Sequence, residues 1–191
     1  MDAGRLMGQD IDDQPGVLAA LLGTVGEIER VAAAVASRGP RFVLLAARGT
    51  SDHAALYGKY LVEIELRRPA GLASPSTLTV YAARPDLTGV LMIAVSQSGA
   101  SPDLVESVQA ARECGAVTVA VTNNAGSALA AAAELHVDIG AGSERAVAAT
   151  KTYTAELLAL HLLLLGIRDG SCSAARERAA PLPDLAAQVL A

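Results

Sequence analysis

Four short apolar runs, rich in Val, Leu and Ile, constrain the fold of this chain more than any other feature of its sequence. They read FVLLA, LMIAV, AVTVAV and LHVDI and occupy residues 42–46, 91–95, 116–121 and 135–139. Each run is nearly continuous in apolar character rather than alternating, which is typical of strands that are buried on both faces of a sheet. A weaker run near residues 71–74 is a fifth candidate strand.

Longer segments with helical patterns separate these runs. They span residues 15–36, 51–66, 102–114, 127–133 and 150–167. Strands that alternate with helices predict an α/β protein. We expect a three-layer αβα sandwich around a five-stranded, mostly parallel sheet of the flavodoxin-like kind, reached by right-handed crossovers.

The length of 191 residues fits a single domain with one core. We expect this domain, with its N-terminal helix, to occupy residues 1–170. Residues 171–191 differ in character, and two interpretations stay open for them. They form either a closing helix from about Asp184 or the start of a linker to sequence that this chain does not contain.

Charge and composition exclude several classes of function. The net charge is −5 and Lys and Arg form no cluster, which argues against binding nucleic acid or an anionic membrane. The first 16 residues carry acidic side chains where a secretory signal needs an apolar stretch. The most apolar helix is interrupted by Lys151, Glu156 and His161, so its uncharged run is far shorter than the about 20 residues that a bilayer requires. With two widely spaced cysteines, we expect a cytoplasmic protein without bound metal or cofactor.

Two loops that follow strands are rich in hydroxyl groups, and open parallel sheets bind ligands beyond the carboxyl ends of their strands. The loops are ARGTSDH, residues 47–53, and SQSGASP, residues 96–102, in which Ser101 fits a helix N-cap and Pro102 the first helical residue. Free N–H groups at a helix N-terminus attract anions. The turns therefore fit a phosphate. The alternative is that the serines only satisfy loop backbone or cap a helix.

A third polar segment, GSERAVAATKTYTAELLAL at residues 142–160, follows the fourth run and enters the last long helix. It brings Glu144, Arg145, Thr150 and Lys151 to the edge of the sheet that carries the two hydroxyl-rich loops. Neither the GxxxxGK[ST] nor the GxGxxG motif occurs, which disfavours a nucleoside triphosphate or NAD as the ligand.

Taken together, three segments resemble the sugar isomerase (SIS) family, and most closely the isomerase half of glucosamine-6-phosphate synthase and its stand-alone isomerase and deaminase-like relatives. They are RGTS at 48–51, SQSGAS at 96–101 and GSERAVAATKTYTAEL at 142–157. The opening IDDQPGVL, residues 11–18, is also similar, so the resemblance covers about residues 7–167.

The resemblance implies a site for a hexosamine 6-phosphate or fructose 6-phosphate, in a chain that pairs as a homodimer through helices beside that site. It assigns substrate binding to Gly49, Thr50, Ser51, Ser96, Gln97, Ser98, Ser101, Val147, Ala148, Ala149 and Lys151. Three positions depart from the family pattern. Arg48 stands where Cys is usual, Ser101 where Thr is usual and Ala149 where Ser is common. Arg48 either adds charge to the phosphate site or pairs with a surface carboxylate.

The family's isomerases resemble a tandem of two SIS modules, and the second carries the catalytic glutamate in an E-x-K-H-G-P stretch that does not occur here. The chain is then a piece of a longer protein, a naturally short relative or one partner of a split pair. Residues 171–191 would be the tail, or the start of a linker to the absent second module.

Isomerisation and deamination both need a base that removes the proton beside a carbonyl group. Glu144 is the first candidate, and pairing with Arg145 or capping the last helix is the alternative for it. His53 is the second candidate, because a histidine changes charge near neutral pH, and its alternative is a polar position near a helix start. The functions to be compared are an enzyme that isomerises, deaminates or dehydrates an amino-hexose 6-phosphate, a non-catalytic sugar-phosphate sensor, and a half-site that a partner chain completes.

Overall fold

The computed structural model describes residues 4–191. Within them, five strands form one sheet in the order β2-β1-β3-β4-β5, and every neighbouring pair is parallel. The strands are β1 (Phe42–Ala46), β2 (Ala70–Leu72), β3 (Val90–Ser96), β4 (Val117–Thr122) and β5 (Leu135–Asp138). The predicted five-stranded α/β sandwich is confirmed, and the four strong apolar runs differ from their strands by no more than one residue at either end.

The helices depart from the expected segments mainly at the two ends of the chain. They are α1 (Arg5–Asp12), α2 (Gln14–Gly23), α3 (Val25–Arg38), α4 (Ser51–Leu61), α5 (Pro75–Leu78), α6 (Pro102–Glu113), α7 (Ala128–Ala132), α8 (Lys151–Asp169), α9 (Ser173–Ala179) and α10 (Leu182–Leu190). The segment expected as one helix over 15–36 is divided at Thr24. The helix expected over 51–66 ends in a wider π turn, η1 (Val62–Leu66).

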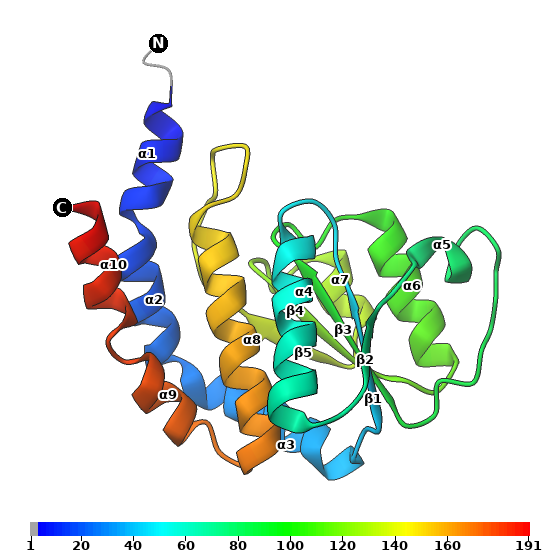
Figure 1. Ribbon diagram of the computed structural model, residues 1–191. Helices are drawn as coiled ribbons and strands as arrows, with labels where there is room; N and C mark the ends of the chain where they lie inside the picture. Colours follow the sequence, from blue (N-terminus) through cyan, green and yellow to red (C-terminus); the bar gives the residue numbers. More distant parts are fainter. Residues whose placement is uncertain (1–3) are drawn as a thin grey trace.

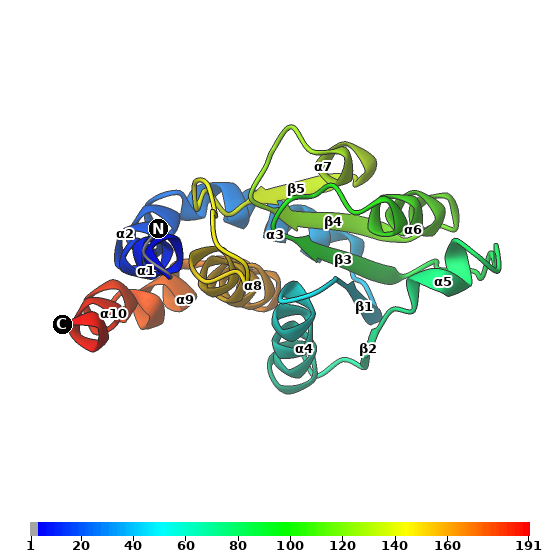
Figure 2. The ribbon, with the colours of Figure 1, turned by 90° about the horizontal axis from the view of Figure 1, so that it is seen from above.

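The sheet is covered on both faces, and Figure 2 shows the layers from above. Alternate strand residues point to opposite faces, so Leu91 and Ile93 pack against α3, α4 and α8, while Met92 and Ala94 pack against α5, α6 and α7. All four of these side chains are fully buried. The continuous apolar runs of the sequence therefore follow from a sheet that has no face exposed to water.

The two ends of the chain form a further layer outside α8 (Figure 1). Helix α2 packs against both α8 and α10, although α10 itself buries no residue. Gly170, with a φ of 73°, ends α8 in the left-handed conformation that glycine tolerates. The domain boundary expected at residue 170 stays a prediction. Residues 171–191 are largely helical, and the closing helix begins at Leu182 rather than Asp184. The expected domain starts at residue 1, so its first three residues lie outside the described range.

Within residues 4–191, no helix combines the length and the apolar character that crossing a membrane requires.

Candidate functional site

The candidate site lies where the chain leaves β1 and β3, the two central neighbours in the sheet. From β1 the chain passes to α4 on one face, and from β3 it passes to α6 on the opposite face. The two loops therefore diverge, and such a switch point opens a crevice beyond the carboxyl ends of the strands. A cavity of about 190 Å³ occupies it, lined by Arg48, Thr50, Ser51, Ser96, Gln97, Ser98, Ser101 and Ala149.

This cavity is small for a site that encloses a whole ligand, and its size suits one polar end of a molecule. Larger cavities of about 600 and 390 Å³ are lined mainly by residues of α2, α3, α8, α9 and α10. Neither gathers a comparable set of hydroxyl groups at strand ends. We therefore regard the small cavity as the functional candidate because its chemistry, rather than its volume, is specific.

In the turn after β3, two serine hydroxyls accept backbone hydrogen bonds and keep their own hydrogens free to donate. The Ser96 hydroxyl accepts the N–H of Gly99 at 3.1 Å, and the Ser98 hydroxyl accepts the N–H of Ala100 at 3.3 Å. A hydroxyl that accepts can still donate its own hydrogen. Both serines thus satisfy loop backbone, as the simpler interpretation expected, and can also donate into the cavity.

Gly99 shapes this turn. Its φ is 62°, and a Cβ at this position would lie 2.3 Å from the Ser127 hydroxyl oxygen. Any side chain would therefore push the turn away from α7.

Ser101 and Thr50 occupy the N-cap positions of α6 and α4, as the sequence predicted for Ser101. Neither side chain makes a capping hydrogen bond. Both residues line the cavity. Two helix N-termini, each carrying a partial positive charge, thus begin at the cavity wall.

Arg48 contributes the positively charged side chain of the cavity lining. Its guanidinium pairs with Asp103 of α6, with Nε 2.7 Å and one terminal nitrogen 2.5 Å from the same carboxylate oxygen. Of its two expected roles, the structure shows the pairing with a surface carboxylate. The pair is partly exposed, so water and salt screen it.

Ser51 differs from the other lining residues because its hydroxyl donates to a buried carboxylate, Glu156 Oε1, at 2.8 Å. Glu156 is 1% exposed. Burial raises the pKa of Glu156 to about 7, the hydrogen bond from Ser51 opposes this rise, and the nearby Glu144 carboxylate adds to it. The sequence had shown Glu156 only as a charged interruption of an apolar helix. Its spacing of four residues from Thr152 and Leu160, both buried, was the signal that it faces the interior.

The third polar segment contributes Ala149 to the cavity, but its other expected binding residues lie elsewhere. Val147 is 98% exposed and Ala148 is exposed too. Gly49 forms the turn before α4 with φ 63° and does not line the cavity.

Lys151 is buried, and its ammonium lies 2.8 Å from Asp13 Oδ2 and 3.1 Å from Asp10 Oδ1. Burial alone would lower the pKa of Lys151, but the hydrogen bonds to Asp13 and Asp10 outweigh it and raise the pKa. Lys151 therefore stays an ammonium and holds α1 and α2 rather than the cavity, which argues against amine catalysis.

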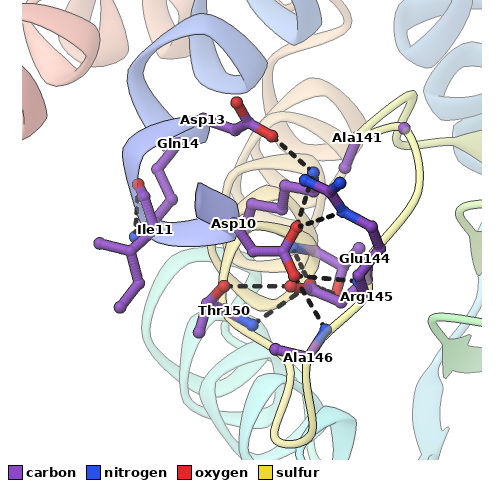
Figure 3. A network of polar contacts seen from close by, with 12 residues as sticks. Asp10, Ile11, Asp13, Gln14, Ala141, Glu144, Arg145, Ala146 and Thr150 are labelled. Carbon is purple, nitrogen blue, oxygen red and sulfur yellow. Dashed lines mark hydrogen bonds and ion pairs between the residues drawn. The ribbon is translucent and has the colours of Figure 1, made fainter. Parts of the chain in front are cut away.

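Asp10 of α1 lies at the centre of the network that Figure 3 shows. Its Oδ2 accepts the N–H groups of Arg145 and Ala146, both at 2.9 Å. Burial acts to raise the pKa of Asp10, yet these hydrogen bonds and Lys151 together lower it. Asp10 thus fixes the segment that precedes Ala149. Sequence reasoning missed it, because the contact joins residues 135 positions apart.

Glu144 accepts four hydrogen bonds, from the N–H and hydroxyl groups of Thr150 and Thr152 at 2.5–3.2 Å. Figure 3 shows it beside Thr150 at the start of α8. The structure therefore shows the helix-capping alternative. His53 is exposed in the first turn of α4. Neither residue lines the cavity, and a catalytic role for either one remains a prediction.

Comparisons with known proteins show the family of this chain. A family model described as the SIS domain matches residues 39–166. The chain is 37% identical to glutamine–fructose-6-phosphate aminotransferase (isomerizing) of Symbiobacterium thermophilum, over 97% of this chain and 33% of that protein. It thus spans about a third of the length of that curated relative.

Solved structures give the same result. A candidate phosphosugar isomerase of Silicibacter pomeroyi DSS-3 has a TM-score of 0.90 and 40% identity, covering 95% of this chain and 56% of that one. The C-terminal domain of glucosamine-fructose-6-phosphate aminotransferase from Francisella tularensis has a TM-score of 0.78 at 22% identity, covering 99% of this chain and 54% of that one, which shows a shared fold. The family model covers the sheet and both hydroxyl-rich turns, so this chain belongs to the SIS domain family.

Proposed function

We propose that the cavity between the β1 and β3 loops binds the phosphate group of a sugar phosphate. The observation that carries this proposal is that five hydroxyl-bearing residues and two helix N-termini meet at one cavity of about 190 Å³. Neutral donors and helix dipoles suit a phosphate, which offers several acceptor oxygens. The rest of the sugar would extend toward Ala149 and the exposed loop before it.

The proposed ligand is an amino-hexose 6-phosphate or fructose 6-phosphate, and the proposed reaction is isomerisation, deamination or a related elimination. The names of the relatives support this choice, because the Symbiobacterium protein is an isomerizing aminotransferase of fructose 6-phosphate. The base would be Glu144 or His53. We further propose a cytoplasmic homodimer that pairs through helices beside the site.

A second candidate function is sugar-phosphate binding without turnover, or a half-site that another chain completes. One observation favours it: Glu144 is engaged in capping α8 and His53 lies outside the cavity lining. A base supplied from elsewhere would then be needed for chemistry.

Paired binding and turnover measurements test these alternatives. The wild-type protein is titrated calorimetrically with fructose 6-phosphate, glucosamine 6-phosphate and N-acetylglucosamine 6-phosphate, and the products are assayed in parallel. Saturable binding with product supports the enzyme, and binding without product supports the second candidate.

We expect the double substitution Ser96→Ala and Ser98→Ala to weaken binding at least about tenfold, since each hydrogen bond to a charged group is worth roughly 1.5–3 kcal/mol. Ser76→Ala, an exposed serine of α5, is the matched control and should leave the affinity unchanged. Equal affinities for the double variant and the wild type would show that the phosphate does not bind in this cavity.

A further inference from the structure

Glu156 is a buried carboxyl group that the proposed function does not use, although one hydrogen bond separates it from the cavity. Its Oε1 accepts the hydroxyl hydrogen of Ser51 at 2.8 Å, and Ser51 lines the cavity. Burying a carboxyl group without a cation is costly, so a purely structural explanation would require a compensating partner.

The surroundings of Glu156 provide no such cation. Within residues 4–191, no Lys, Arg or His forms an ion pair with it, and the charged group that acts on it is the carboxylate of Glu144. Lys151, on the same helix, is held by Asp10 and Asp13. On α4, which carries Ser51, the neighbouring Asp52 and His53 are exposed.

The direction of the hydrogen bond between Ser51 and Glu156 decides what the cavity presents to an anion. A hydroxyl group has one hydrogen. When Glu156 is ionised, Ser51 donates that hydrogen to it and presents only lone pairs to the cavity. When Glu156 is protonated, its own hydrogen can be donated to Ser51 Oγ, and the Ser51 hydrogen becomes free to point at a phosphate oxygen.

We propose that Glu156 is a positioning residue that orients the Ser51 hydroxyl, so that a phosphate monoester binds in the cavity with uptake of up to one proton by Glu156. The proton comes from solvent and resides on the Glu156 carboxyl group, and no bond of the ligand is made or broken. This inference rests on the proposed function, because it requires the phosphate to bind beside Ser51.

Electrostatics acts in the same direction as the hydrogen bond. Burial already raises the pKa of Glu156 to about 7, so the carboxyl group is about half ionised in the free protein at neutral pH. A phosphate dianion bound beside Ser51 would add a second negative charge near Glu156, and this charge would raise the pKa of the Glu156 carboxyl group further. The bound state therefore favours the protonated carboxyl group over the neutral pH range.

The test compares wild type with Glu156→Gln by calorimetric titration with glucosamine 6-phosphate and fructose 6-phosphate between pH 6 and pH 8. Glutamine is a neutral analogue of the protonated acid and cannot titrate. The phosphate of the ligand titrates near pH 6, but it does so equally for both proteins. The ratio of the wild-type Kd to the Glu156→Gln Kd should therefore rise about tenfold from pH 6 to pH 8.

Proton uptake is measured at pH 7 in two buffers that differ in ionisation enthalpy, and wild type should take up more protons than Glu156→Gln. If both proteins bind with the same pH profile and the same proton count, the inference is wrong while the proposed function stands. If wild type binds none of the ligands, or Ser96→Ala with Ser98→Ala has no effect, the proposed function itself fails.

A second measurement does not depend on the variant folding. In wild-type protein labelled with ¹³C at the glutamate carboxyl groups, the resonance of Glu156 should titrate at higher pH with saturating sugar phosphate than without it. An unchanged midpoint would overturn the inference. A structural role alone would lower stability or affinity evenly across pH and would shift neither the ratio nor the midpoint.

Discussion

At the scale of single residues, the buried carboxyl group of Glu156 has a consequence for stability that is independent of any ligand. Its pKa in the folded protein is about 7, above the ordinary value of 4.5. The folded state therefore binds more protons than the unfolded state between these two values, so the free energy of unfolding falls as pH rises through this range.

We expect Glu156→Gln to remove this pH-dependent fall in the free energy of unfolding. From pH 5 to pH 8, the wild-type free energy of unfolding should fall by roughly 1–3 kcal/mol more than that of the variant. Urea unfolding at both pH values measures the difference. Parallel pH profiles for the two proteins would contradict the assigned pKa.

The site residues differ in whether neighbouring positions in the sequence are enough to predict them. The serines at 96, 98 and 101 were predictable, because a strand, a turn and a helix start follow one another within a few positions. Asp10 and Glu156 were not, since each acts through a partner more than 100 positions away. Val147 resembled a binding residue only by its place in a motif, and its exposure depends on how the loop around it folds.

At the scale of elements, α1 restrains the loop that leads to α8. Asp10 accepts two backbone N–H groups of this loop and pairs with Lys151 at the start of α8. Removing one partner from a buried ionic network leaves the other groups uncompensated. The loop therefore depends on a helix at the opposite end of the sequence.

We expect Asp10→Asn to lower the free energy of unfolding by roughly 3–5 kcal/mol and to speed amide hydrogen exchange in residues 143–150. Asp12→Asn, an exposed carboxylate of the same helix, is the matched control and should change neither quantity. Unaltered exchange in the Asp10 variant would show that α1 does not restrain the loop.

The sequence predicted elements best where burial on both faces was compatible with only one kind of element. The runs that became β3 and β4 are covered on both faces, so their apolar patterns allowed little besides a central strand. The edge strand β2 has three residues and gave a weak signal. Helix α1 was missed because its role is ionic. The division at Thr24 lies between Gly23 and Gly26, two poor helix formers whose signal the continuous helical segment expected over 15–36 did not take into account.

At the scale of the whole molecule, the homodimer is the expectation most open to a direct measurement. Leu56, Tyr60 and Ile64 recur every four residues along α4 and η1 and are 41%, 56% and 64% exposed. Residues four apart lie on one face of a helix. This apolar stripe lies on the helix that begins at the cavity and continues into η1.

Light scattering should give twice the chain mass of 19.4 kDa for the wild-type protein, and Tyr60→Glu should shift it toward the mass of one chain. Tyr81→Glu is the matched control, because Tyr81 is an exposed aromatic residue outside the stripe. A monomeric wild type, or a dimer insensitive to Tyr60→Glu, would contradict pairing through α4.

The cavity lies where the turns after β1 and β3 diverge, and this position affects how the choice of ligand can change. The proposed phosphate end lies in turns that follow the central strands directly, whereas the remainder of a ligand would face the loop before α8, which hydrogen bonds of Asp10 and Glu144 hold in place. Replacing the part of this loop that lies between the Asp10 and Glu144 contacts should therefore change which sugar binds, while the affinity for the esterified end of the sugar stays the same.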